Sequence, residues 1–116
     1  MIETIVLNVL NEQLGTISAY MEVPEQKPSS YVVLQKTGSK LVNQLPSATF
    51  AVQSIAGTLY EAASLNELVK SIMENLPWLT EEVFGAELDS DYNFTDITTK
   101  ERRYQAVYNI TYKETE

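Results

Sequence analysis

Cysteine and histidine are both absent from the 116-residue chain. Without cysteine, the sequence excludes disulfide frameworks, thiolate metal sites and cysteine nucleophiles. Without histidine, it lacks the commonest general base and the commonest metal ligand. Only 4 glycines occur, and the sequence holds neither a phosphate-binding glycine pattern nor a Gly-x-Ser-x-Gly nucleophile motif. We therefore expect no catalytic, metal or cofactor site, and no residue argues for an enzyme.

Long apolar runs and basic residues are also scarce. No segment approaches the roughly 18–20 apolar residues of a membrane helix, and residues 1–4 lack the basic region of a signal peptide. The 8 Lys and Arg residues are outnumbered by 16 Asp and Glu residues, for a net charge of −8. Because polyanions repel such a chain, we expect no binding to membranes and no specific binding to nucleic acids.

What is present is the composition of an ordinary globular protein. Hydrophobic residues make up 44% and charged residues 21% of the chain. A single core typically takes about 100–150 residues. The sequence therefore predicts one domain over residues 1–116.

Two segments have the apolar spacing of amphipathic helices. Residues 2–14 place apolar side chains three and four positions apart, and Gly15 is suited to end that helix with a positive φ. Residues 59–76 repeat the pattern with Leu65, Val69 and Ile72. Thr58, directly before this segment, and Glu61, in its first turn, fit a capping box. Pro77 is expected to stop the helix.

Five other segments are predicted to be strands. They are residues 19–23, 31–36, 47–55, 86–95 and 103–113. Residues 40–46 are predicted to be a connecting loop. In the fourth strand, Leu88, Tyr92 and Phe94 are expected on one face and the acids on the other. Asp96 or Glu101 is expected to pair with the basic Arg102 and Arg103 across the last turn.

The order of these elements is helix, three strands, helix, two strands. Both apolar helix stripes are buried if the helices pack on one face of a mainly antiparallel sheet. We therefore predict an α+β fold of the order α-β-β-β-α-β-β, with Val69, Ile72, Tyr104, Tyr108 and Ile110 in the core.

Negative charge is concentrated in one segment. Residues 71–99 contain seven acids and no Lys or Arg: Glu74, Glu81, Glu82, Glu87, Asp89, Asp91 and Asp96. A solvated face and a functional negative surface both account for this charge. Asp89, Asp91 and Asn93 imitate the start of a calcium loop, but Phe94 and Lys100 replace its turn glycine and closing glutamate. Strand alternation is the preferred interpretation.

Apolar residues outside the regular patterns are candidates for a protein interface. Leu41, Val42 and Leu45 stand in the predicted loop near Lys36 and Lys40, and Trp78 follows the predicted helix stop. Such residues anchor interfaces when they are exposed. For Trp78 we expect instead that the ring folds back onto the core.

Several short motifs occur in an order and spacing that can be compared with those of a known protein family. They are the runs at residues 31–38 (YVVLQKTG), 50–54 (FAVQS), 61–63 (EAA), 94–96 (FTD) and 103–110 (RYQAVYNI). In their order and spacing the chain resembles the tail terminator proteins, also called tail completion or minor capsid proteins, of long-tailed bacteriophages and prophages.

The resemblance implies a non-enzymatic virion protein that assembles in the host bacterial cytoplasm. It would form a homo-hexameric ring between the tail tube protein and the head–tail connector protein, at the head–tail interface. DNA would pass through the ring, and Glu81, Glu82, Glu87, Asp89 and Asp91 would be candidates for its lumen. The alternatives are another neck or adaptor protein of the virion, or a small cytosolic enzyme or ligand-binding domain that uses the acidic cluster.

Overall fold

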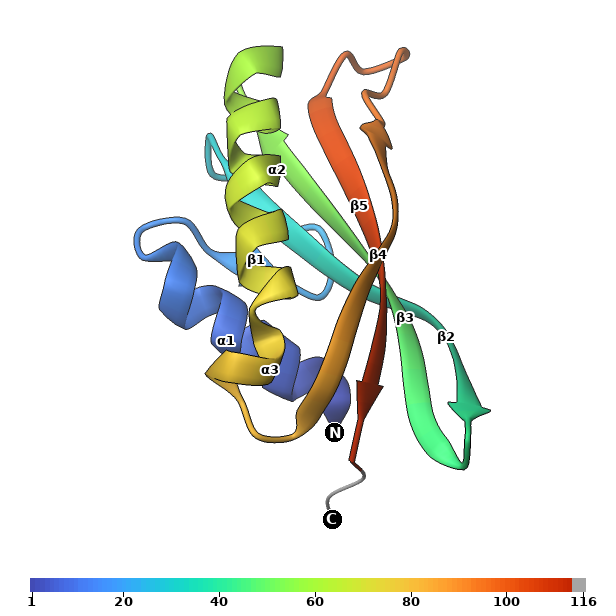
Figure 1. Ribbon diagram of the computed structural model, residues 1–116. Coiled ribbons are helices and arrows are strands. Elements are labelled where there is room, and N and C mark those ends of the chain that lie inside the picture. Colours follow the sequence, from blue (N-terminus) through green and yellow to red (C-terminus); the bar gives the residue numbers. More distant parts are fainter. Residues whose placement is uncertain (114–116) are drawn as a thin grey trace.

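The architecture is a single sheet with helices on one face (Figure 1). The computed structural model describes residues 1–113. Its elements are α1 (Ile2–Leu14), β1 (Ala19–Tyr20), β2 (Tyr31–Val42), β3 (Leu45–Ala56), α2 (Leu59–Glu74), α3 (Leu76–Leu79), β4 (Val83–Asn93) and β5 (Arg102–Tyr112). The sheet order is β1-β2-β3-β5-β4, and only the pairing of β1 with β2 is parallel. The predicted α+β class and element order are confirmed, with the short α3 in addition.

The two long helices form where the apolar spacing predicts them. Gly15 ends α1 with a φ of 72°, a conformation that residues with a Cβ avoid. At the start of α2, the Thr58 hydroxyl oxygen accepts a hydrogen bond from the Glu61 amide at 3.1 Å. Helix α2 ends at Glu74 rather than residue 76, and Pro77 lies in the first turn of α3, where its missing N–H is tolerated. Within residues 1–113, no helix is long and apolar enough to cross a membrane.

The main core lies between the helices and the sheet. Val69 and Ile72 of α2 pack there with Tyr108 and Ile110 of β5, as predicted. Tyr104 is only half-buried, because it lies near the end of β5 that pairs with the exposed Asn93. The Tyr108 hydroxyl, inside this layer, donates to the Glu74 carboxylate at 2.8 Å. Burial, and then this hydrogen bond, raise the pKa of Tyr108 above its ordinary value.

A smaller cluster lies on the opposite face of the sheet. It consists of Tyr31, Val33 and Ile55, with Tyr20 against them. Successive residues of a strand point to opposite faces, so Val32 enters the main core while Val33 enters this cluster. The sheet is therefore partly covered on both faces at this end.

The prediction that residues 40–46 form a connecting loop is wrong. Strands β2 and β3 continue to a two-residue turn at Asn43 and Gln44, with Val42 opposite Leu45. Gly38 does not break β2, because a register shift between Lys36 and Gly38 absorbs one extra residue. Asn43 and Gln44 have φ values of 51° and 67°, which is the geometry that joins tightly paired antiparallel strands.

The first predicted strand is shorter than expected. Only Ala19 and Tyr20 pair with β2. The side chain of Asn11 in α1 accepts from the Ala19 amide at 2.8 Å and donates to the Ala19 carbonyl at 3.2 Å. These bonds satisfy both backbone groups of Ala19 and hold β1 against α1.

The expected alternation along β4 is also wrong. The register shifts between Leu88 and Ser90, so that Asp89 is an extra residue. Leu88 lies opposite Tyr108 and faces the helices, whereas Tyr92 lies opposite Gln105 and faces away. The bulge therefore turns Asp91, opposite the core residue Ala106, toward α2.

Candidate assembly interface

The end of the β2–β3 hairpin is formed by residues 38–46, and its last part, residues 41–46, extends beyond the rest of the sheet. We name residues 38–46 the hairpin end. Strand β5 pairs with β3 only from Ser47 onward, so the last part is a two-stranded ribbon. Leu41 lies opposite Pro46, and Val42 lies opposite Leu45, which places apolar pairs on both faces of the ribbon. Leu41 is 71% exposed. A two-stranded ribbon is marginally stable alone, so a covering surface would stabilise it.

A second apolar surface lies where α1, α2 and α3 meet. Leu68, Trp78 and Leu79 surround a hollow of about 260 Å³, and we name this surface the helical corner. Trp78 is 86% exposed, so the expectation that it folds back onto the core is wrong. Helix α3 is one turn long with Leu76 buried. A residue two positions further on points about 200° away, which directs Trp78 to solvent.

The sequence candidates for an interface therefore fall on two separate surfaces. In Figure 1 the hairpin end reaches to the lower right, while α3 lies at the lower left, on the face of the sheet that the helices cover. Lys36 belongs to neither surface, because its ammonium lies 3.4 Å from the Glu3 carboxylate and links β2 to α1. Lys40 and Leu45 belong to the hairpin end. Because the hairpin end and the helical corner are far apart, they cannot contact each other within one chain.

The acids of residues 71–99 do not form one uniform surface. Glu74 accepts from Tyr108, and Asp96 pairs with Arg103 at 3.8 Å. Glu82 accepts from the Thr80 hydroxyl, and this bond lowers the pKa of its carboxyl group. Glu81, Glu87 and Asp89 are exposed and form no ion pair within residues 1–113. These three are the acids that most fully face solvent.

Asp91 has a structural partner that the sequence did not reveal. Its carboxylate accepts from Lys70 of α2 at 2.6 Å and from the Asn66 amide at 2.7 Å. The bond from Lys70 to Asp91, followed by its bond to Glu67, raises the pKa of Lys70. Asp91 is thus part of the contact between α2 and β4, and this contact exists because the bulge at Asp89 turns the strand.

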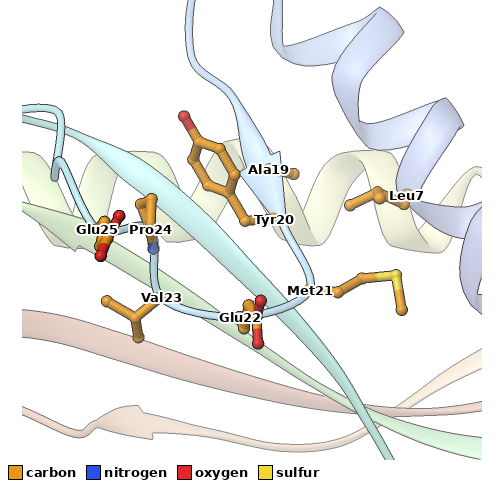
Figure 2. Close-up of a pocket in the computed structure, with 8 residues that line it drawn as sticks. All are labelled: Leu7, Ala19, Tyr20, Met21, Glu22, Val23, Pro24 and Glu25. Carbon is orange, nitrogen blue, oxygen red and sulfur yellow. The ribbon is translucent and has the colours of Figure 1, made fainter.

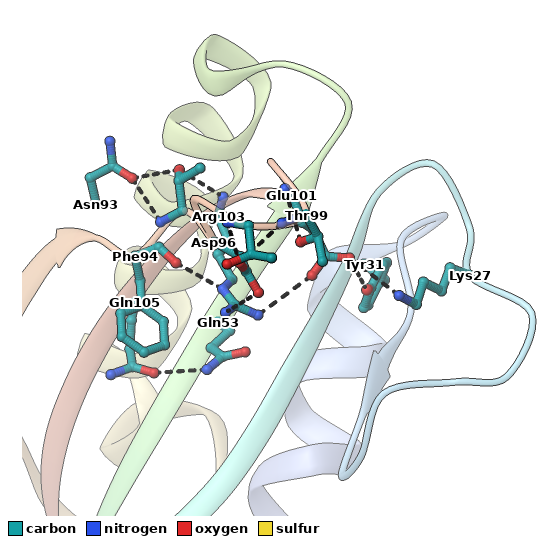
Figure 3. A network of polar contacts seen from close by, with 12 residues as sticks. Lys27, Tyr31, Gln53, Asn93, Phe94, Asp96, Thr99, Glu101, Arg103 and Gln105 are labelled. Carbon is teal, nitrogen blue, oxygen red and sulfur yellow. Dashed lines mark hydrogen bonds and ion pairs between the residues drawn. The ribbon is translucent and has the colours of Figure 1, made fainter.

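A polar network on the face away from the helices joins distant segments (Figure 3). Arg103 lies 3.4 Å from Glu101 and stacks over the Phe94 ring at 5.0 Å. Glu101 in turn accepts from the Tyr31 hydroxyl at 3.0 Å and lies 3.6 Å from Lys27. Burial, and then the bond to Glu101, raise the pKa of Tyr31 to about 12. The predicted pairing with Asp96 and Glu101 is confirmed for Arg103, whereas Arg102 instead donates to the Lys100 carbonyl. The link from Glu101 to Tyr31 was missed because 70 positions separate the two residues.

A hollow of about 810 Å³ lies beside β1 (Figure 2). Residues 19–25 form most of its wall and Leu7 of α1 adds to it. Its side chains are mainly apolar, with the carboxylates of Glu22 and Glu25. It holds no hydroxyl nucleophile beside a base, and no group of three or more acids within residues 1–113 is arranged to hold a metal ion.

Comparisons with known proteins give a likeness of fold. No family model matches the sequence, and no curated protein matches it. Solved structures do match, and one of them is titled "Virion of native gene transfer agent (GTA) particle". Its chain superposes with a TM-score of 0.62 at 15% identity, over 91% of this chain and 85% of that chain. At this identity the match shows a shared fold.

Proposed function

We propose that this chain is a structural protein of a phage-like virion and acts as its tail terminator. The observation that carries the proposal is the fold, which is shared over nearly the whole chain with a component of a gene transfer agent virion. The motifs that resemble tail terminators lie on β2, β3, the start of α2, the segment after β4 and β5. Most of them therefore belong to the central strands of the sheet and to a helix packed on it.

The proposed role is mechanical and needs no catalytic group. Six copies would close into a ring that caps the tail tube and contacts the head–tail connector. Two separate apolar surfaces, the hairpin end and the helical corner, support repeated contacts between copies or with the tube. A ring requires each copy to use two different surfaces, and this chain presents two.

The acids have a proposed role in the passage of DNA. Duplex DNA carries one negative charge per roughly 1.7 Å, so a negative lumen would let it slide rather than bind. Of the candidates, Glu81, Glu87 and Asp89 support this role best because they face solvent. Glu82 is held by Thr80, and the charge of Asp91 is offset by Lys70.

The test measures assembly and binding to tail tubes. Native mass spectrometry and negative-stain microscopy over a range of concentrations should show a six-membered ring, in solution or on purified tubes. Gold-labelled protein should decorate one end of each tube. Labelling along the tube, or no binding to tube ends, would contradict the tail terminator role. Binding only to isolated connectors would favour the neck or adaptor alternative.

A further inference from the structure

The hairpin end and the helical corner complement each other in charge as well as in apolar character. Lys40 is the one charged residue of the hairpin end and forms no ion pair within residues 1–113, whereas Lys27 and Lys36 are paired with Glu101 and Glu3. Residues 61–96, which include α2, α3 and β4, contain nine acids and one base, Lys70. Opposite charges on two surfaces steer their association and fix its orientation.

The acids lie close to the apolar residues of the helical corner. Glu67 directly precedes Leu68, and Glu81 follows Leu79 by two positions. Both are exposed. On the hairpin end, Lys40 directly precedes Leu41. The hairpin end therefore has one positive charge beside its apolar residues, and the helical corner has two acids beside its own, of which Glu67 is paired with Lys70 at 2.9 Å. An apolar centre with a polar rim is the anatomy of a protein interface.

The shapes also correspond. The hairpin end is a narrow ribbon with apolar side chains on both faces at its turn. The helical corner is concave, with the Trp78 ring beside a hollow of about 260 Å³. An exposed tryptophan beside a hollow is the kind of residue that dominates binding energy when a partner covers it.

We propose that the hairpin end of one copy docks on the helical corner of the next copy. The contact rests on the proposed assembly and specifies which surfaces form it. Lys40 approaches the acids around Trp78, while Leu41, Val42 or Leu45 fills the hollow beside the ring. Since the two surfaces are different parts of the chain, the end of the β2–β3 hairpin and the place where the helices meet (Figure 1), the contact is head-to-tail, and its repetition generates a ring where the rotation between copies closes.

The decisive experiment mixes two variants that each lack one surface. The first carries Leu41→Asp and Val42→Asp, and the second carries Trp78→Ala. Each variant alone should sediment as a monomer where the wild type assembles, with at least about 30-fold weaker self-association. An equimolar mixture retains one intact contact and should form a 1:1 dimer and nothing larger. This dimer also shows that each variant is folded.

Two exposed side chains elsewhere provide matched controls. Ile97→Asp introduces one of the two negative charges at a position that is 89% exposed, and Tyr60→Ala removes an aromatic ring that is 81% exposed. Neither change should alter self-association. A mixture of the two interface variants that remains monomeric up to about 1 mM would overturn the contact.

Trp78, the single tryptophan, reports on the same contact directly. Its emission should shift to shorter wavelength as the wild type assembles. A ring that forms with unchanged tryptophan emission would overturn the proposed contact while leaving the tail terminator role intact. A wild-type chain that stays monomeric at every concentration, and also fails to bind tube ends, would overturn both.

Discussion

The ammonium of Lys70 and the carboxylate of Asp91 lie 2.6 Å apart, joining the middle of α2 to the far half of β4. Their side chains are only 19% and 25% exposed. The pair forms because the extra residue Asp89 reverses the facing of β4. One acid of the negative segment is thereby committed to holding the helix on the sheet.

The Lys70–Asp91 pair should contribute stability that disappears at high pH. The pKa of Lys70 is raised in the folded protein above the ordinary 10.5. Its contribution is therefore fully present below pH 10.5 and is lost as the pH rises through the raised value. A double-mutant cycle with Lys70→Met and Asp91→Asn should give a coupling of about 1 kcal/mol at pH 8. Chemical denaturation at pH 8 and above pH 11 measures it, and a coupling that does not fall at the higher pH would contradict the pairing.

The buried face of α2 should dominate stability. Ile72→Ala removes a side chain that is 5% exposed in the main core. Such a truncation costs about 2–5 kcal/mol, which should lower the Tm by at least about 8 °C. Ile97→Ala makes the same change at an exposed position and should leave the Tm nearly unchanged. Calorimetry of the two variants provides the comparison, and equal Tm values would contradict the placement of α2.

Replacing Gln44 with glycine should relieve backbone strain in the turn at Asn43 and Gln44. Gln44 has a φ of 67°, a conformation that costs a residue with a Cβ roughly 1 kcal/mol or more. Gln44→Gly should therefore slow hydrogen exchange of the Leu45 amide by about 5-fold. Gln44→Ala retains the Cβ and should not slow it. If both variants exchange alike, the turn has another conformation in solution.

Calcium should not bind tightly at Asp89, Asp91 and Asn93. The positive Lys70 already lies against Asp91, and the three residues belong to a strand rather than a loop. Titration calorimetry should show no affinity tighter than about millimolar, the weak end of calcium modules. A micromolar affinity that Asp89→Asn abolishes would contradict this prediction and favour the ligand-binding alternative.

Reversing the solvent-facing acids should create affinity for DNA. Glu87→Lys with Asp89→Lys should give the assembled protein binding to duplex DNA that weakens steeply with salt. Glu22→Lys with Glu25→Lys makes the same charge change in the segment after β1 and should have less effect if the first pair lines the lumen. Filter binding at several salt concentrations compares the two. If the two variants bind DNA with equal affinity, the position of the reversed charges does not affect binding, which would contradict a lumen role for Glu87 and Asp89.

The sequence predicted the helices and the long strands because each carries its own periodic signal. Val69 and Ile72 repeat at helical spacing, and Tyr108 and Ile110 alternate at strand spacing, so their burial could be anticipated. The class α+β followed from the order of these segments. The helix cap at Thr58 was likewise visible, because a capping box depends on residues only three positions apart.

The features that were missed depend on pairing between distant residues. A bulge such as that at Asp89 is set by the register with β5, which periodicity within β4 cannot reveal. The hairpin end continues past Gly38 because β3 supplies the opposite strand, although the local residues have weak strand propensity. Trp78 lies in a helix of 4 residues, too short for any periodic pattern to indicate which side faces the core.

The exposed edge of the sheet at β4 has features that oppose aggregation of the chain. Strand β4 has β5 on one side only, and an exposed strand edge is a template for aggregation. Here Glu87, Asp89 and Asp91 follow one another along that edge, and the bulge distorts its hydrogen-bonding pattern. Two copies that approached edge to edge would bring these carboxylates together. The charges and the bulge thus protect this edge from pairing with the same edge of a second copy.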